Sequence, residues 1–302
     1  QWRLLGQSLD RLPARVLHQN ACLVVWRARR CIEEGRPEDA LRLLSPLPAC
    51  VRQSNDSTVA VRALTVVGIA LRLIGKIDAS LAELEQARSS LGGIESSSDL
   101  RAELAHNLGI GYAIKRDSHR ARALLGEALA LSERIGDMAR ACKVHYDLGA
   151  MNTEQGRLDE ALAHYDVALS GLEKLGNEVE ATGVLNNLAM AHFLMADYGL
   201  ARDVLLRAVP KAASLGLTRT EAYCQITLAD VYLTLEEYPE AVAAYERGVH
   251  LAGQCGEHPL LVYGQGGLAR SLLKTGRAVR AKVLLREALA LAEEQRLELH
   301  RG

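Results

Sequence analysis

The sequence predicts an all-α protein, a right-handed superhelical solenoid of seven consecutive helix-turn-helix units. Three observations predict this fold. Small residues recur every 40 or 41 positions along the 302-residue chain, apolar residues follow them at spacings of four and seven, and glycines recur with the same period. No segment alternates apolar and polar residues with the period of two that strands require.

Two small residues, twelve positions apart, define each unit. The first is at Ala28, Gly68, Gly109, Gly149, Ala189, Ala229 and Ala269, and the second is at Ala40, Ser80, Ala121, Ala161, Ala201, Ala241 and Ala281. Small side chains at matched points of two helices let the backbones approach closely. Each unit is therefore predicted to be an antiparallel pair of helices of roughly 16 to 18 residues each.

The second helix of each unit carries an apolar stripe. Four residues after its small residue come Leu44, Leu84, Leu125, Tyr165, Leu205, Tyr245 and Leu285. A single helix pair cannot bury such stripes alone, so the units must stack. The predicted repeats are residues 14–55, 56–96, 97–136, 137–176, 177–216, 217–256 and 257–300, within one solenoid of residues 1–302. Residues 1–12 are predicted to be the remnant of a preceding helix.

Glycine marks the predicted helix ends. Gly136, Gly176, Gly216 and Gly256 are expected to close the second helices in the left-handed conformation, with Asn55 at the matching point of the first unit. The turn inside a unit is marked by Gly35, Gly75, Gly156 and Gly276. Asp78 and Asp159 are expected to cap the helices that follow.

These spacings resemble the tetratricopeptide repeat, which has a Leu-Gly pair, a tyrosine three residues later, and small, aromatic and small residues along its second helix. The matching residues are Leu108-Gly109 with Tyr112, Leu148-Gly149 with Ala161, Tyr165 and Ala168, and Leu228-Ala229 with Tyr232, Ala241 and Tyr245. The resemblance covers about residues 14 to 300. Two departures are a unit about six residues longer than the common form and the absence of the usual proline after the second helix.

Longer units of this kind are similar to those of kinesin light chains, of cell-polarity adaptors, and of the sensor arm in MalT-like bacterial transcription regulators, which are large ATP-binding proteins of the LuxR type. Leu9-Asp10-Arg11-Leu12-Pro13 and Gly35-Arg36-Pro37-Glu38-Asp39-Ala40-Leu41 are similar to the start of that arm. This resemblance implies the sensing arm of a multidomain transcription regulator. The alternative is a free-standing adaptor that binds an extended peptide of a partner protein.

Composition narrows the function classes. No apolar run is long enough to span a bilayer, no secretion signal opens the chain, and the six cysteines include no C-x-x-C pair, so we expect a reduced, cytoplasmic protein without a membrane partner. Because the first residue is Gln, we expect a piece of a longer protein. The net charge is +4 over residues 1–52, −6 over residues 141–200 and +4 over residues 270–302. These values are too small for the concentrated basic surface that nucleic-acid binding needs.

No catalytic motif is present. Gly109-Ile110-Gly111 and Gly264-Gln265-Gly266-Gly267 lack the preceding strand of a phosphate-binding turn, and the nine histidines show no ligand spacing. His145, His164 and His192 are interpreted as structural. We therefore expect a protein that is not an enzyme and that needs neither a metal nor another cofactor.

The candidate binding site lies on the first helices. Two positions before the packed small residue stand Trp26, Val66, Asn107, Asp147, Asn187, Thr227 and Gly267, so four consecutive units carry a polar side chain. At about 100° per residue this position belongs to a stripe that faces away from the partner helix, where the resemblance implies a concave wall. The candidate ligand-binding residues on this stripe are His106, Asn107, Lys143, Tyr146, Asp147, Asn186, Asn187, Tyr223, Asp230, Tyr263 and Arg270.

Asparagine is a poor residue for a helix interior, and its repetition suggests a use. An amide both donates and accepts hydrogen bonds, so a series of amides can hold a peptide backbone or a small-molecule effector in the concave groove. In kinesin light chains a run similar to Asn186-Asn187-Leu188-Ala189 is implied to hold peptides. The alternative is that these amides only link adjacent first helices. Tyr112, Tyr165, Tyr232 and Tyr245 are interpreted as packing residues.

Both ends of the chain are expected to expose apolar surface. Trp2, Leu4, Leu5 and Leu9 lie near the start, and Leu284, Leu285, Ala288, Leu291 and Ala292 form one stripe of the last helix. Flanking domains of the same protein are the expected partners of these ends. Without them, self-association through the ends is expected.

Overall fold

The computed structural model describes residues 20–45, 47–48, 51, 57–91 and 98–295, and in these residues it contains fourteen helices and no strand. The predicted all-α fold of paired helices is confirmed. The chain divides into two compact units, Gln1–Val144 and His145–Gly302, and the division falls inside α10 (Met138–Glu154). Each unit is described by itself, and one continuous solenoid over the whole chain stays a prediction.

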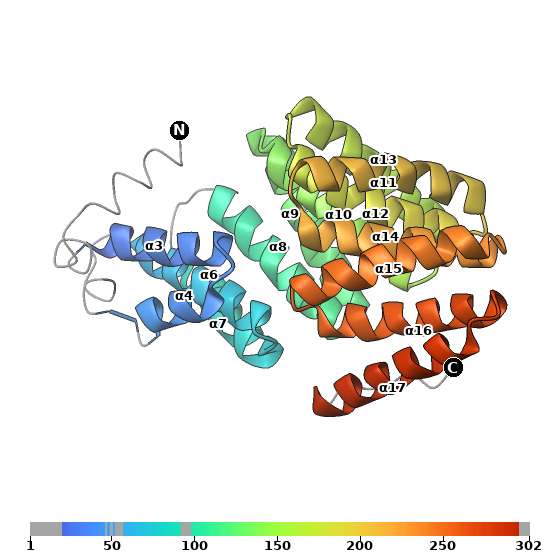
Figure 1. Cartoon of the computed structure of the whole chain (residues 1–302). Helices are drawn as coiled ribbons and strands as arrows, with labels where there is room; N and C mark the ends of the chain where they lie inside the picture. Colours follow the sequence, from blue (N-terminus) through green and yellow to red (C-terminus); the bar gives the residue numbers. More distant parts are fainter. Residues whose placement is uncertain (1–19, 46, 49–50, 52–56, 92–97, 296–302) are drawn as a thin grey trace. The chain divides into compact units, whose positions relative to one another are not determined.

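The first unit is built from three consecutive helix pairs and the start of α10 (Figure 1). Its helices are α3 (Ala21–Glu33) with α4 (Pro37–Leu44), α6 (Ser57–Leu73) with α7 (Ile77–Leu91), and α8 (Ser98–Ile114) with α9 (Ser118–Ile135). The predicted opening helix remnant and Asn55 lie outside the described residues.

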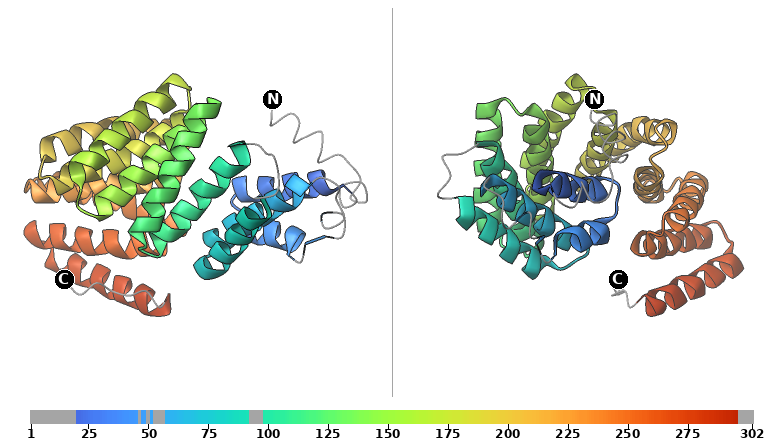
Figure 2. Two further views of the ribbon diagram at one scale, coloured as in Figure 1. Left: turned by 180° about the vertical axis from the view of Figure 1, so that it is seen from behind. Right: turned by 90° about the vertical axis from the view of Figure 1, so that its left-hand side faces the viewer.

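The second unit continues the same pairing, and both views of Figure 2 show consecutive helices side by side. Its helices are the rest of α10 with α11 (Leu158–Lys174), α12 (Glu178–Leu194) with α13 (Tyr198–Ser214), α14 (Thr218–Thr234) with α15 (Tyr238–Gln254), and α16 (His258–Lys274) with α17 (Ala278–Glu294). First helices of successive pairs also contact each other, α12 with α14 and α14 with α16.

The predicted close approach of paired helices is confirmed at the small residues. Ala161, Ala201 and Ala241 are fully buried. A Cβ atom placed on Gly149 would lie 2.6 Å from Cε1 of Tyr165, and one placed on Gly109 would lie 2.8 Å from Cγ of Leu125. The residue four positions after the second small residue therefore fills the space that glycine leaves open.

The turn inside every pair is made by one left-handed residue. Four of the seven are the predicted glycines, such as Gly156 at φ +71°, and the other three are Arg116, Ala196 and Glu236 at φ near +60°. The following amide donates to the carbonyl five residues back, as Arg157 does to Asn152 at 2.9 Å. This bond satisfies a carbonyl that the helix end leaves without a partner. Gly136, Gly176, Gly216 and Gly256 close the second helices in the same left-handed conformation, as predicted.

The capping prediction was wrong in detail. Asp78 and Asp159 lie in the first turn of α7 and α11, and the residue that caps α11 is Arg157, without a side-chain bond. Their carboxylates favour the helix start through the helix dipole, and Asp78 also forms an ion pair with Lys115 at 2.8 Å. Side-chain caps are present at Asn20, Asp117 and Asn177, where the Oδ1 of Asn177 accepts from the amide of Glu180 at 3.2 Å, whereas Asp197 precedes α13 without such a bond.

The last helix differs from the second helices before it. Ala288 and Ala292 are buried, against the prediction that their stripe is uncovered, because this side of α17 faces its own pair. Leu285 is 41% exposed, whereas the equivalent residues of all six earlier pairs are at most 1% exposed. Among the described residues, no helix combines the length and apolar character needed to cross a membrane.

Candidate functional site

Hydrogen bonds between first helices involve three of the predicted site residues in the second unit, Tyr146, Asn186 and Asn187. Asn187 of α12 donates from Nδ2 to Oη of Tyr146 on α10 at 2.9 Å. Thr227 of α14 donates from Oγ1 to Oδ1 of Asn186 at 3.1 Å, or to the carbonyl of Tyr223 at 3.0 Å. The polar positions of successive pairs thus bond to one another, and the first helices are fixed side by side by about 0.5–1.5 kcal/mol for each bond.

A pocket of about 270 Å³ opens beside these bonds. It is lined by Tyr146, Gly183, Asn186, Asn187, Arg219, Thr220 and Tyr223, and we call it the amide pocket. Its residues come from α10, α12 and α14 and lie two to ten residues before the packed small residues Gly149, Ala189 and Ala229. Burial raises the pKa of Tyr146, and nearby Asp147 raises it further, so its phenol is a neutral donor at physiological pH.

Gly183 adds no side chain to the wall of this pocket. A Cβ atom at Gly183 would meet no atom within 4 Å, in contrast to Gly149. Glycine inside a helix costs about 0.5–1 kcal/mol relative to alanine, and packing does not require it here. The missing side chain instead leaves room between α10 and α14.

Arg219 provides the positive charge of the amide pocket. Its Nε lies 2.7 Å from Oε1 of Glu257, and its guanidinium lies over the ring of Tyr223, 5.9 Å from the centroid. Tyr223 donates to the other oxygen of Glu257 at 3.3 Å. Glu257, the residue before α16, therefore orients both side chains at the pocket edge.

A second cluster lies three turns further along α14. Asp230 is 8% exposed and accepts hydrogen bonds from Tyr245 of α15 and, at 3.0 Å, from the half-exposed Tyr263 of α16. We call Asp230, Tyr245 and Tyr263 the aspartate cluster. Burial raises the pKa of Asp230, while the two phenols and Arg270 act in the opposite direction. Burial also raises the pKa of Tyr263, to about 12, with Asp230 adding to the shift.

The glycine at position 267 is explained by this cluster. A Cβ atom at Gly267 would overlap the ring of Tyr245, since it would lie 2.3 Å from Cζ. Gly267 is the next position of the polar series on the first helices. The phenol of Tyr245, which bonds to Asp230, occupies the space of a side chain there, so the series ends at Thr227.

The other predicted site residues lie apart from these two groups. Asn107 of the first unit is buried, and its Nδ2 donates to the carbonyl of Glu103 in its own helix at 2.9 Å. His106 is also buried, Lys143 and Arg270 are exposed, and Asp147 is half-buried. Trp26 and Val66, at the same positions of the first two pairs, are half-buried and buried.

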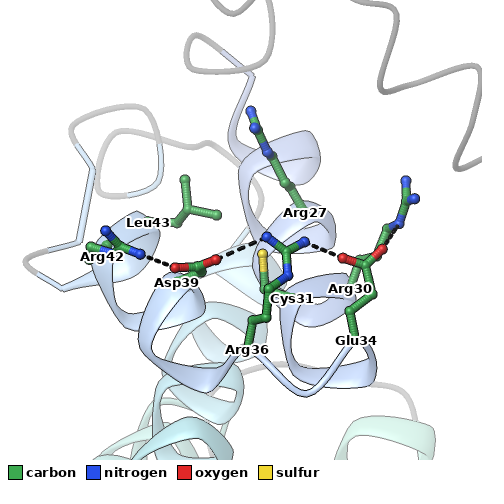
Figure 3. A pocket seen from close by; sticks show the side chains of 8 residues that line it. All are labelled: Arg27, Arg30, Cys31, Glu34, Arg36, Asp39, Arg42 and Leu43. Carbon is green, nitrogen blue, oxygen red and sulfur yellow. Dashed lines mark hydrogen bonds and ion pairs between the residues drawn. The ribbon is translucent and has the colours of Figure 1, made fainter.

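The first unit contains a larger pocket, about 350 Å³, that no sequence motif predicted. It is lined by Arg27, Arg30, Cys31, Glu34, Arg36, Asp39, Arg42 and Leu43. Figure 3 shows five of these side chains as a chain of alternating charges, with Arg36 between Glu34 and Asp39. These charged side chains are paired with one another within a single helix pair. The amide pocket has spare hydrogen-bond donors from several helix pairs, so it is the stronger candidate for a binding site.

Comparison with known proteins identifies the fold. No protein-family profile and no curated protein matches the chain. A signal-transduction ATPase with a tetratricopeptide repeat sensor, PH0952 from Pyrococcus horikoshii, superposes with a TM-score of 0.71 over 89% of this chain and 41% of that protein, at 16% identity. The chain has the tetratricopeptide-like repeat fold.

Two further structures share this tetratricopeptide-like fold. The apo form of RapI matches with a TM-score of 0.73 over 91% of this chain and 77% of RapI, at 12% identity. NprR in complex with its cognate peptide NprX matches with a TM-score of 0.64 over 99% of this chain and 87% of NprR, at 17% identity. At such identities the likeness establishes the fold.

The sequence did not predict Gly183, Arg219 and Thr220. Gly183 lies six residues before Ala189, at the last position of the predicted stripe, but has no side chain to suggest a role. Arg219 and Thr220 lie ten and nine residues before Ala229, beyond the end of the predicted stripe. Extending the stripe by one helical turn would have found Arg219. The contact between His145 and His164, whose Nδ1 atoms lie 2.9 Å apart, was missed because 19 residues and a turn separate them.

Proposed function

We propose that this chain is a non-catalytic scaffold that binds an extended peptide on the first-helix face of the second unit. We further propose that it is the sensing arm of a multidomain regulator. The observation that carries the first proposal is the amide pocket, in which Asn186, Asn187 and Tyr146 of neighbouring first helices are fixed by mutual bonds. Preorganised donors of this kind lose little conformational entropy when a ligand binds.

The chemistry of this face suits a peptide backbone. Each amide nitrogen has two hydrogens, and Asn187 uses one of them on Tyr146. The remaining donors project toward a pocket large enough for a few main-chain atoms. A backbone carbonyl is an acceptor that every peptide carries, so this recognition requires no particular side chain.

The sensing role is supported by two structural neighbours. NprR is described with a bound cognate peptide, and PH0952 carries its repeats as the sensor of a larger ATPase. The present chain spans less than half of PH0952. We infer that this chain occupies the corresponding place in a protein with an ATPase and a DNA-binding part.

The peptide proposal is tested by selection from a random peptide library, followed by titration calorimetry. Asn187→Ala is expected to weaken the selected peptides about tenfold, or about 1.4 kcal/mol, with little change in the melting temperature. Asn107→Ala, whose amide bonds within its own helix, is the matched control and should bind as the unchanged protein does. Equal affinity in all three proteins, or a selection that yields no peptide, would contradict the proposal.

The second proposal has a rival, a free-standing adaptor. Sequencing the coding region on both sides of this segment separates them. A P-loop upstream and a helix-turn-helix downstream support the sensing arm. Their absence from the complete reading frame would favour the adaptor.

A further inference from the structure

Helix α14 carries a cation and an anion on one side. Arg219 and Asp230 are eleven residues apart, which at about 100° per residue returns to within about 20° of the same direction. At about 1.5 Å per residue the two positions are about 16 Å apart along the helix. Tyr223 and Thr227 lie between them on the same side.

The Arg219 end has more donors than acceptors. Oδ1 of Asn186 accepts from Thr227 at 3.1 Å, and Oδ1 of Asn187 accepts from Nδ2 of Asn186 at 3.4 Å, so both amide oxygens have partners. Spare hydrogens remain on both amide nitrogens, on the Tyr146 phenol and on the Arg219 guanidinium. Such a group of donors suits an anionic acceptor, and a carboxylate is the one that peptides offer.

The Asp230 end has the opposite character. Its carboxylate can accept about four hydrogen bonds, and the phenols of Tyr245 and Tyr263 supply two. Both phenol oxygens can also accept, and the half-exposed ring of Tyr263 offers its face to a cation. Among the described residues, no cationic side chain bonds to Asp230; Arg270 acts on it only through its field.

We propose that this face selects an extended peptide that carries one carboxylate and one ammonium or guanidinium group about five residues apart. The carboxylate binds at Arg219 and the amide pocket, and the cation binds at the aspartate cluster. An extended chain advances about 3.3–3.6 Å per residue, so five residues span the separation along α14. This inference rests on the proposed peptide binding and adds the charge pattern of the ligand.

The buried carboxylate supports this assignment. An aspartate in a helix interior lowers helix stability, and a charge at 8% exposure is costly unless it is paired. The equivalent positions of the four preceding first helices hold Ile69, Ile110, Ala150 and Met190, so the fold does not require an acid there. A cation delivered by a ligand would supply the missing partner.

The test uses capped hexapeptides of serine and glutamine with lysine at one end and glutamate at the other, in both orders, measured by calorimetry on the whole chain. A peptide with lysine and glutamate two positions apart and a peptide without charges are the controls. An uncapped pentapeptide of serine and glutamine separates terminal from side-chain charges. We expect one end-charged peptide to bind at least tenfold more tightly than both controls.

Three variants assign the ends. Arg219→Gln should remove the advantage conferred by the carboxylate, and Tyr263→Phe should weaken only peptides that carry the cation, because the exposed ring stays in place. Asp230→Asn should weaken the binding of cation-carrying peptides more strongly than Tyr263→Phe does, and circular dichroism checks that this variant folds. This inference would be overturned if the peptides selected from the library carried no paired charges, or if the affinity of the hexapeptides did not depend on the spacing of their charges. Either result would leave the peptide proposal standing. Failure of every library peptide to bind would overturn both.

Discussion

Seven turns of the fold need a left-handed residue, and three are made without glycine. Ala196 has φ +63°, in the same conformation as Gly156 and Gly276. For a residue with a Cβ atom this conformation costs about 1–2 kcal/mol. The Schellman-type bond that follows, from Asp197 to the carbonyl of His192 at 2.9 Å, forms in spite of that cost.

We therefore expect Ala196→Gly to stabilise the fold by about 0.5–1 kcal/mol, since relief of the backbone strain exceeds the added entropy of the unfolded chain. The reciprocal variant, Gly156→Ala, should destabilise by a similar amount. Urea denaturation of both measures the effect. A loss of stability in Ala196→Gly would show that the alanine methyl makes a contact worth more than the strain.

The histidine pair predicts a pH dependence of stability. Burial lowers the pKa of His164, and His145 lowers it further, while Glu160 raises it. The unfolded chain therefore binds a proton more readily than the folded chain, so the free energy of unfolding falls as pH drops below about 6.5 toward the lowered pKa. His164→Gln should remove this part of the dependence in denaturation curves between pH 5 and 8. An identical pH slope in the variant would contradict the assignment.

At the scale of the helix, two glycines have opposite roles. A Cβ atom placed on Gly149 would lie 2.6 Å from the ring of Tyr165, whereas one placed on Gly183 would meet no atom within 4 Å. Gly149→Ala is expected to cost about 1–3 kcal/mol through overpacking, whereas Gly183→Ala should add about 0.5–1 kcal/mol through helix propensity. Thermal melting of the two variants tests the difference. Equal shifts would mean that α12 is packed at Gly183 as tightly as α10 is at Gly149.

The helices themselves could be predicted from sequence because their signal repeats. A small residue at the position of Ala161 and a Leu or Tyr at the position of Tyr165 recur in all seven pairs, and the glycine at the position of Gly156 recurs in four, so errors at one copy are corrected by the others. The site was predicted only in part. Tyr146, Asn186, Asn187 and Tyr223 do meet in one pocket, but whether an amide faces a ligand or its own helix, as at Asn107, depends on rotamers that the period does not determine.

Non-repeating features had no such support. Arg219 fell outside the predicted stripe because cationic residues at helix starts are common and carry no period. Asp230 was found, but its phenol partner Tyr245 was interpreted as packing only. Tyr245 does both, since its ring is fully buried while its hydroxyl reaches Asp230.

On the scale of the whole molecule, the outer side of α17 exposes Val279, Val283, Leu285 and Leu289. In the six earlier pairs the residue equivalent to Leu285 is at most 1% exposed, and one of them, Tyr245, packs against Gly267 of the following first helix. We expect the isolated chain to self-associate through this side, as exposed apolar patches do. Sedimentation should show a dimer that Leu285→Lys and Val283→Lys dissociate. Leu206→Lys on α13, an equally exposed position, is the control, and a monomer at all concentrations would refute the expectation.

The equivalence of the left-handed glycines also has a genetic consequence. Gly176 and Gly216 share φ values of 67° and 68°, and each is followed by a first helix that starts in the same register. In-frame loss of residues 177–216 would join Gly176 to Leu217 without changing the local backbone. Thr227 would then take the position of Asn187 beside Tyr146. Gene rearrangement in whole blocks can therefore change the order of polar side chains along the first helices while leaving every turn intact.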